Sequence, residues 1–304
     1  MLPPENKSLA VVGDLQMTSW LVRATMRRES NHEAQQLLIE DLRLQLDDLA
    51  AVALVGDLVF NVRSRRDWLH FDALMNSIAA RVPLLPALGN HDYHCVFVEL
   101  CWHGVVPKNA RLRFPWLAPG EPYWVEYGPL ALIFLDSETG IEAQGAWLTE
   151  LLPGLPQRFR AAVVFVHRPP YTNGTTRGLV PALEVRQQLS AAFAGSDIVP
   201  LVISGHAHGY EHLASDGIHY LVSAGGGGPR GWLSPLRPLD VYRGPNCETD
   251  AARQIMRPFN YLLVNVEATA VYVEVRGFCK NDPSVRVLES FRVPFAGDTP
   301  AFSP

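Results

Sequence analysis

The stretch AVVGDLQMTS, residues 10–19, is an apolar run that ends abruptly in a glycine, a carboxylate and a polar turn. Such a run is typical of a buried strand, which would carry the Asp14 carboxylate at its end. Similar runs recur along the chain with helix-like segments between them. The expected strands are 9–12, 51–55, 84–88, 130–135, 161–166, 198–203 and 220–223, and the expected helices are 33–48, 65–80, 144–151 and 181–194. This alternation predicts an α/β fold, with buried sheets covered by helices.

The C-terminal part of the chain has a different pattern. After Phe259, YLLVNVEATAVYVEVRG and then RVLESFRV predict a meander of antiparallel strands. Segment 225–245, rich in Gly and Pro, predicts a long surface loop rather than a domain boundary. Ser30 stands three residues before Glu33, the spacing of a helix-capping box. We expect one domain over residues 1–304, with two sheets packed together.

Composition and charge narrow the function classes. The chain has 304 residues, 48% of them hydrophobic and 19% charged, as in an ordinary globular protein. Its net charge of −5 and the lack of a dense basic run argue against binding nucleic acid or an anionic membrane by bulk electrostatics. No apolar stretch approaches the roughly 20 residues of a membrane span, and the start resembles no signal peptide. We therefore expect a cytoplasmic protein.

The four cysteines are Cys95, Cys101, Cys247 and Cys279. They show neither CxxC spacing nor the density of a disulfide scaffold. We expect them to be scattered thiols, and in particular we expect Cys95 and Cys101 not to pair.

Five of the expected strands end in residues of metal-binding types. These residues are Asp14, Asp57, Asn90 with His91 and Asp92 in LGNHDYH, His167 in VHRPPY, and His206 and His208 in SGHAHGYEH. Residues at the carboxyl ends of neighbouring strands converge on one crevice. Two Asp, one Asn and three His suit a pair of divalent first-row ions, with one carboxylate bridging them. Two such ions about 3.5–4 Å apart would share a bridging hydroxide as nucleophile and clamp a phosphate ester.

In this order the residues resemble the metallophosphoesterase superfamily, also called calcineurin-like phosphoesterases. Within it, HRPPY and GHAHGYEH are most similar to the purple acid phosphatase branch. The resemblance implies a four-layer α/β/β/α sandwich of two mixed β-sheets flanked by helices, with the metal site at the carboxyl ends of the strands. It also implies a dinuclear-metal-dependent hydrolase of phosphate monoesters or diesters.

The resemblance implies a role for each residue of the site. Asp57 would bridge two divalent ions (Mn, Fe, Zn or Mg), Asp14 and His208 would hold the first ion, and Asn90, His167 and His206 would hold the second. His91 would act on the phosphate as an acid or electrostatic stabiliser instead of binding metal. Asp92 would orient the His91 imidazole.

Two residues depart from the family pattern. Many members have His where this chain has Gln16, and purple acid phosphatases have an iron-binding Tyr where it has Phe60. We therefore expect a colourless enzyme. The Gln16 oxygen reaches as far as the Nε2 of a His, so it could bind the first ion and favour Mn²⁺ or Mg²⁺. Alternatively, Gln16 only hydrogen-bonds a metal-bound water or the substrate.

Candidate substrate groups lie next to these motifs in the sequence. They are Arg168, Tyr171, His94, Tyr210 and His212. The run SAGGGGPR, residues 223–230, lacks the ending of a Walker phosphate loop, so we expect a tight turn that passes close to the metals. The leading hypothesis is an enzyme acting on a small phosphorylated substrate. A catalytically weakened binding or regulatory protein is the alternative, and a nuclease is disfavoured because no basic groove is evident.

Overall fold

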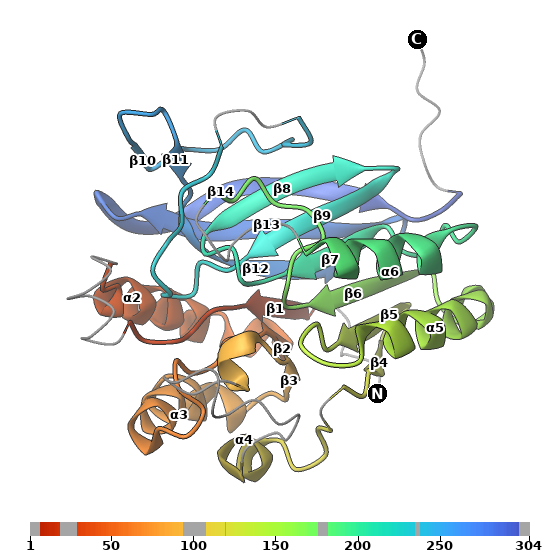
Figure 1. The fold of residues 1–304 in the computed structure, drawn as a ribbon, viewed down its shortest axis with the longest axis horizontal. Helices are drawn as coiled ribbons and strands as arrows, with labels where there is room; N and C mark the ends of the chain where they lie inside the picture. The colour runs from red at the N-terminus through yellow and green to blue at the C-terminus, as the bar shows by residue number, and fades with distance from the viewer. Residues whose placement is uncertain are drawn as a thin grey trace.

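Two six-stranded β-sheets pack face to face in the computed structural model of this chain (Figure 1). The structure describes residues 7–18, 29–93, 108–118, 120–175, 182–234 and 238–297. The first sheet has the order β14-β13-β12-β1-β2-β3, and the second has the order β4-β5-β6-β7-β9-β8.

The first sheet joins the two ends of the described chain. Its strands are β1 (Ser8–Val12), β2 (Leu49–Val55), β3 (Leu84–Ala87), β12 (Phe259–Val266), β13 (Ala270–Cys279) and β14 (Asp282–Pro294). Strands β1, β2 and β3 run parallel, whereas β12, β13 and β14 form an antiparallel meander that pairs with β1. The predicted meander is therefore confirmed.

The second sheet comes from the middle of the chain. Its strands are β4 (Tyr123–Tyr127), β5 (Leu130–Leu135), β6 (Ala161–Val166), β7 (Leu201–Ser204), β8 (Tyr210–Ser215) and β9 (Ile218–Ser223). Strands β5, β6, β7 and β9 run parallel, and the edge strands β4 and β8 are antiparallel to their neighbours. The sequence analysis missed both edge strands because neither is a continuous apolar run.

Helices cover the outer face of each sheet. The longer ones are α2 (His32–Leu44), α3 (Arg65–Ala79), α5 (Ile141–Leu151) and α6 (Leu183–Phe193). Helices α2 and α3 pack on the first sheet and α5 and α6 on the second, at opposite sides of the molecule in Figure 1. The expected α/β arrangement of two mixed sheets flanked by helices is confirmed. Shorter elements among the described residues are α4 (Lys108–Arg113), 3₁₀ turns at Leu46–Asp48, Asn90–Asp92 and Leu152–Gln157, and the hairpin of β10 (Glu248–Thr249) and β11 (Ile255–Met256).

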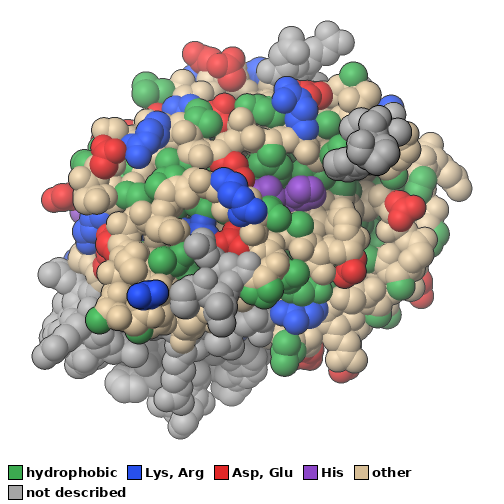
Figure 2. All heavy atoms as spheres, turned by 90° about the horizontal axis from the view of Figure 1, so that it is seen from above, with side chains coloured by type: hydrophobic (Ala, Val, Ile, Leu, Met, Phe, Trp, Pro, Cys, Tyr) green, Lys and Arg blue, Asp and Glu red, His purple; other side chains and the backbone are tan. Residues whose placement is uncertain are grey.

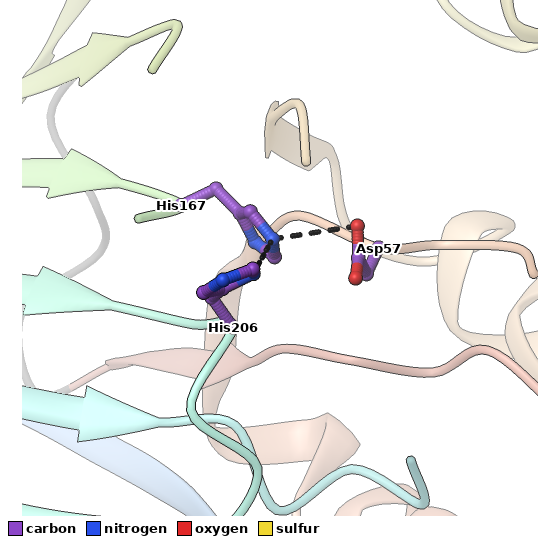
Figure 3. Close-up of side chains that lie close together, drawn as sticks. All are labelled: Asp57, His167 and His206. Carbon is purple, nitrogen blue, oxygen red and sulfur yellow. Dashed lines mark hydrogen bonds and ion pairs between the residues drawn. The ribbon is translucent and has the colours of Figure 1, made fainter. Parts of the chain in front are cut away.

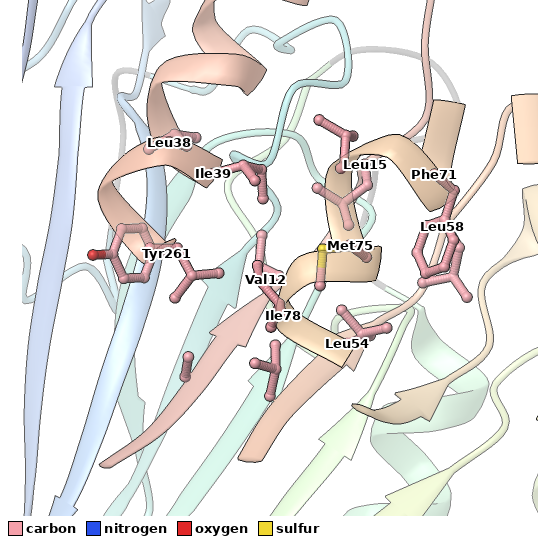
Figure 4. Close-up of a cluster of buried hydrophobic side chains, with 14 of the residues drawn as sticks. Val12, Leu15, Leu38, Ile39, Leu54, Leu58, Phe71, Met75, Ile78 and Tyr261 are labelled. Atoms are coloured by element: carbon pink, nitrogen blue, oxygen red, sulfur yellow. The ribbon is translucent and has the colours of Figure 1, made fainter. Parts of the chain in front are cut away.

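Successive side chains of a strand point to opposite faces of the sheet, and this divides the core into layers. In β1, Leu9 and Val11 face the second sheet, whereas Val12 packs beneath α2 and α3 (Figure 4). Leu38 of α2 and Ile78 of α3 belong to the same outer cluster and are completely buried. Because each such side chain contributes about 1.5–3 kcal/mol on burial, these layers hold the strand ends in a rigid frame.

Three local predictions are wrong. Asn31, not Ser30, precedes α2, and no side chain caps that helix end. Segment 225–245 is not a surface loop throughout, because residues 225–231 are buried.

Cys247 and Cys279 form a disulfide, with Cα atoms 5.1 Å apart, instead of remaining thiols. They are 32 residues apart in sequence, and only the packing of the chain brings them together. Cys95 and Cys101 lie outside the described residues.

Candidate metal centre

Six of the predicted site residues converge where the two sheets meet. Asp14, Asp57 and Asn90 follow β1, β2 and β3 of the first sheet. From the second sheet, His167 follows β6, while His206 and His208 lie between β7 and β8. All except Asn90 are buried. The site therefore lies at the carboxyl ends of the strands, as the α/β topology predicts.

The backbone at these strand ends adopts a rare conformation. Asp14, Asp57 and His206 have φ angles of 60°, 53° and 69°, in the left-handed region that non-glycine residues seldom occupy. Such strain persists only where the surrounding structure enforces it, and it clusters at functional sites. Gly56, at φ 90°, turns the chain directly before Asp57, where a Cβ would lie 2.3 Å from His167 Nδ1. Only glycine permits this close approach.

One group of donor atoms is formed by Asp14, Asp57 and His208. Their ligand atoms all lie within 4.8 Å of one another. His208 Nε2 is 3.1 Å from Asp14 Oδ1. The Gln16 amide lies in the same place, since its Nε2 is 3.0 Å from Asp57 Oδ2 and 3.1 Å from His208 Nε2. The Gln16 amide nitrogen is therefore within hydrogen-bond distance of two residues of this group, and both roles expected for Gln16 stay predictions.

A second group is formed by Asp57, His167 and His206, shown in Figure 3. His167 Nε2 lies 3.4 Å from Asp57 Oδ1 and 3.2 Å from His206 Nδ1. Asn90 adds its Oδ1, which is 3.2 Å from His167 Nε2. Asp57 belongs to both groups, which is the geometry that a bridging carboxylate requires.

Backbone carbonyls orient two of the imidazoles. His167 Nδ1 is 2.8 Å from the Val55 carbonyl oxygen, and His208 Nδ1 is 2.7 Å from that of Pro229. An Nδ1–H that donates to a carbonyl leaves Nε2 with its lone pair, which is the form that binds a metal. In both residues this Nε2 points at the carboxylates.

The electrostatics of the site favour a cation. Burial, reinforced by the Asp14 and Asp92 carboxylates, raises the pKa of Asp57 well above its usual range. Burial also raises the pKa of Asp14 and lowers that of His167, so the His167 imidazole adds little positive charge. Among the described residues, Gln16 Oε1 is a buried oxygen without a hydrogen-bond partner. Crowded carboxylates, neighbouring imidazole nitrogens and an unpaired oxygen fit a divalent metal centre.

His91 lies beside the two groups without belonging to either. Its Nδ1 is 2.8 Å from the Phe60 carbonyl oxygen, and its ring stacks on the Phe60 ring with centroids 5.0 Å apart. The Asp92 carboxylate accepts hydrogen bonds from the backbone N–H groups of Leu58 and Gly89, and its expected role in orienting the His91 imidazole stays a prediction. Asp92 therefore braces the two loops that carry Asp57 and Asn90. Burial raises the pKa of Asp92 to about 7.

A carboxylate that the sequence analysis overlooked holds Arg168. Glu138 accepts hydrogen bonds from Arg168 Nε at 2.7 Å and from Arg168 Nη2 at 3.0 Å. Arg168 Nη1 in turn lies 3.4 Å from His206 Nε2, so its guanidinium is at the edge of the second group. Glu138 follows β5, and the strand-end rule that found the other residues would also have found it.

The other predicted substrate groups have structural contacts. Tyr210 is buried, and its hydroxyl donates to Glu289. His212 is also buried, where its ring pairs with Glu289 and stacks on Phe291. Tyr171 packs between Arg186 and Tyr220. Tyr210 and His212 lie two residues apart on β8 and therefore on one face, which packs against Glu289 and Phe291 of β14. His94 lies outside the described residues.

The glycine-rich turn passes close to the metal centre, as predicted. Gly226 N donates to the Gly13 carbonyl, and Gly228 N donates to that of Asp14. A Cβ on Gly228 would lie 3.1 Å from the His208 ring. The turn therefore closes one side of the first group with backbone alone.

Comparison with known proteins agrees with this geometry. The sequence profile of the family described as calcineurin-like phosphoesterase matches residues 7–210. Curated proteins include no sequence that matches this chain.

Solved structures share the fold at low sequence identity. A purple acid phosphatase from yellow lupin (Lupinus luteus) has a TM-score of 0.67 and 18% identity over 95% of this chain. The chain spans about half of that enzyme, 53% of its length.

Two further structures are matched over most of their own length. A dimetal phosphatase from Danio rerio has a TM-score of 0.58 and 12% identity over 96% of this chain and 99% of its own. GAP50, the anchor in the inner membrane complex of Plasmodium, has a TM-score of 0.61 and 13% identity over 95% of this chain and 89% of its own. The match over residues 7–210, which contains every residue of the site, shows that the chain belongs to the calcineurin-like phosphoesterase family.

Proposed function

We propose that this protein is a dinuclear-metal-dependent hydrolase of phosphate esters. The observation that carries the proposal is the double membership of Asp57, whose carboxylate lies in both donor groups. Asp14 and His208 complete the first site, and Asn90 and His167 with His206 complete the second. When bound, two divalent ions would neutralise the phosphoryl oxygens and lower the pKa of water toward neutrality.

The residues around the centre provide positioning and a proton. Hydrogen bonding to the Phe60 carbonyl and stacking on the Phe60 ring hold the His91 imidazole, so its Nε2 is directed to protonate the leaving oxygen. Arg168, held by Glu138, lies where a phosphoryl oxygen would meet the second site. The bidentate pair keeps the guanidinium in one orientation, which is suited to a planar clamp on phosphate.

Gln16 completes the first site in this proposal. An exchange of its amide oxygen and nitrogen would direct Oε1, now without a partner, toward Asp57 and His208. A neutral oxygen donor there suits Mn²⁺ or Mg²⁺ better than softer metals.

Hydrolysis of generic aryl phosphate monoesters and diesters by the metal-reconstituted protein tests the proposal. We expect turnover with Mn²⁺, Fe²⁺, Zn²⁺ or Mg²⁺, and none in His91→Ala at the same metal content. If folded, metal-loaded wild type hydrolyses neither ester class, the proposal is wrong. The ratio of the two activities separates a phosphatase from a phosphodiesterase.

A catalytically weakened binding or regulatory protein is the second candidate. Gln16 favours it because the amide is a weaker donor than the imidazole found in many relatives. The likeness to the Plasmodium anchor protein supports the same view at the level of the fold. Metal stoichiometry separates the candidates, since fewer than two ions per chain at saturation favours the weakened protein.

The substrate proposed is a small phosphate ester, with no nucleic acid or membrane as partner. On the face drawn in Figure 2, acidic and basic described side chains are interspersed rather than gathered into one basic area. In the described residues no helix is both long and apolar enough to cross a bilayer.

A cytoplasmic location stays a prediction, and the Cys247–Cys279 disulfide weighs against it because cytosolic thiols are mostly kept reduced. Alkylation of the protein directly on lysis of its native cells, followed by mass spectrometry, would show whether the two cysteines are bonded.

A further inference from the structure

A cavity of about 440 Å³ opens beside the candidate metal centre. Its described walls come from the residues after β1, the start of α2, the loop after β2, the start of α3 and the glycine-rich turn. Helices α2 and α3 lie next to each other on this side of the molecule in Figure 1. None of the residues assigned to the two metal sites lines the cavity.

Two walls connect the cavity to the chemistry. Phe60 lines it, and the same ring stacks on His91. Gly227 also lines it, and the next residue, Gly228, lies against the His208 ring. The cavity therefore borders the ring that stacks on His91 and the turn that lies against the first donor group.

The position of His91 indicates which part of a substrate would enter the cavity. This step rests on the proposed function, in which His91 protonates the leaving oxygen. The group attached to that oxygen must extend away from the metals on the side of His91. That side is where Phe60 forms the cavity wall, so the cavity is placed to hold the leaving group.

The chemistry of the walls favours a ring over a second anion. Met17 and Phe60 are apolar. The rings of His32 and His70 lie 5.1 Å apart, and His70 Nε2 is 2.5 Å from Gln35 Oε1. Flat surfaces of this kind bind planar groups by stacking.

The charges on the cavity wall offset each other. Arg66 and Asp67 both line it. The Asp67 carboxylate accepts hydrogen bonds from the Ser64 hydroxyl at 2.7 Å and from Asn61 N at 2.9 Å, so it stays in place at the start of α3. A fixed carboxylate next to Arg66 disfavours the binding of a second anionic group of the substrate in the cavity. Burial, followed by the neighbouring His32, lowers the pKa of His70, which therefore adds little positive charge.

We propose that this cavity is a leaving-group subsite for an uncharged alcohol that carries an aryl or heteroaryl ring. A volume of about 440 Å³ lies within the range of sites that bind small molecules, and it exceeds what a short alkyl alcohol would fill. The subsite would select ring-bearing phosphate esters over small alkyl phosphates.

Two primary alkyl phosphates test the subsite, because their leaving groups differ in the ring and little in the ester chemistry. We expect kcat/KM for 2-phenylethyl phosphate to exceed that for ethyl phosphate by about 30-fold, the effect of burying one ring. Arg66→Trp, which fills the cavity from its lining, should reduce this ratio to about 3-fold. Arg65→Trp is the matched control: it makes the same change one residue earlier on α3, outside the cavity lining, and should keep the ratio near 30-fold.

His70→Trp is a second filling variant in case Arg66→Trp does not fold, and it should also reduce the ratio. 2-Carboxyethyl phosphate tests the anionic alternative, and we expect it to be no better than ethyl phosphate. A wild-type ratio within about threefold of unity, an equal ratio in all variants, or a preference for the carboxylate substrate would overturn the subsite.

Binding separates failure of the subsite from failure of the proposed function. The non-hydrolysable 3-phenylpropylphosphonate should bind the Mn²⁺-loaded wild type about 30-fold more tightly than propylphosphonate, as measured by calorimetry. If neither phosphate ester is turned over but this preference is seen, the catalytic proposal fails and the subsite stands. If turnover occurs without any ring preference in binding or kinetics, the subsite fails and the catalytic proposal stands.

Discussion

The two sheets contribute to the metal centre in different ways. The first sheet supplies oxygen donors, Asp14, Asp57 and Asn90, and two of these have positive φ angles. The second supplies nitrogen donors, His167, His206 and His208, of which two are oriented by backbone carbonyls. One wall therefore carries the carboxylates, and the other carries the imidazoles, two of which are held in one orientation. Ions bound between them would add to the contacts that already join the sheets, such as the hydrogen bond from the Tyr210 hydroxyl to Glu289.

The largest loss of activity and of bound metal is expected when the shared carboxylate is removed. Asp57→Ala should lower kcat/KM on the order of 10³-fold and leave neither ion bound, because this residue belongs to both groups. His206→Ala, which removes one donor of one group from the opposite wall, is the control and should keep one ion. Elemental analysis of the dialysed proteins measures this, and two ions retained in Asp57→Ala would contradict the bridging role.

Removing the metal should lower stability, because the ions would tie the two walls together. At free metal near 100 times the dissociation constant, binding to the folded state alone contributes about 2.7 kcal/mol. Chelation with EDTA should therefore lower the free energy of unfolding by about that amount, as measured by urea denaturation. The same chelation should have little effect on Asp57→Ala. An unchanged midpoint in protein shown to contain metal would mean that the sheets do not depend on the ions.

The Glu138–Arg168 pair tests the wall that carries the imidazoles, because Arg168 lies next to His206. Glu138→Gln removes a charge from the bidentate pair with Arg168 and should raise KM about tenfold with a smaller change in kcat. Arg168→Lys should behave similarly, because ammonium cannot form the fork. Steady-state kinetics measure the split, and a loss confined to kcat would show that the pair acts on the chemical step instead.

The free energy of unfolding is expected to depend on pH through the buried carboxyl group of Glu211. Burial raises the pKa of Glu211 to about 7, above its ordinary 4.5, while Thr172 and Asn173 donate hydrogen bonds to it. The folded state therefore binds this proton more tightly than the unfolded state. The resulting stabilisation is complete below pH 4.5 and is lost as the pH rises through about 7.

Glu211→Gln should remove this contribution, on the order of 1–3 kcal/mol between pH 4.5 and 8. Urea denaturation of both proteins at pH 5 and pH 8 measures the difference. Parallel pH profiles for wild type and variant would show that Glu211 does not titrate in this range.

A further effect is expected from making the two walls more alike. Gln16→His replaces a neutral oxygen donor by an imidazole and should tighten metal binding at the first site by about tenfold, or 1.4 kcal/mol. Calorimetric titration with Zn²⁺ measures the change. Gln36→His, on the exposed side of α2, is the control for adding a histidine to the chain. Unaltered affinity in Gln16→His would leave Gln16 as a hydrogen-bonding residue only.

The site residues could be predicted because each lies shortly after the end of a strand. Asp14, Asp57, His167 and His206 were recognisable one at a time, since an apolar run that ends in a polar residue marks a strand end. The same rule applied to the strand over residues 130–135 would have shown Asp136 and then Glu138. Tyr210 and His212 were misassigned because closeness to His208 in sequence says nothing about which side of β8 a residue faces.

Residue types and their order were enough to predict the strand-end site residues and the two-sheet fold, because these depend on short-range patterns. Tertiary structure alone decided the contacts between distant segments: Glu138 with Arg168, the Phe60 carbonyl with His91, Cys247 with Cys279, and the cavity between α2 and α3. Such contacts depend on how two layers pack across many residues of chain. Local periodicity records which face of an element is buried, but not which residue of another element it meets.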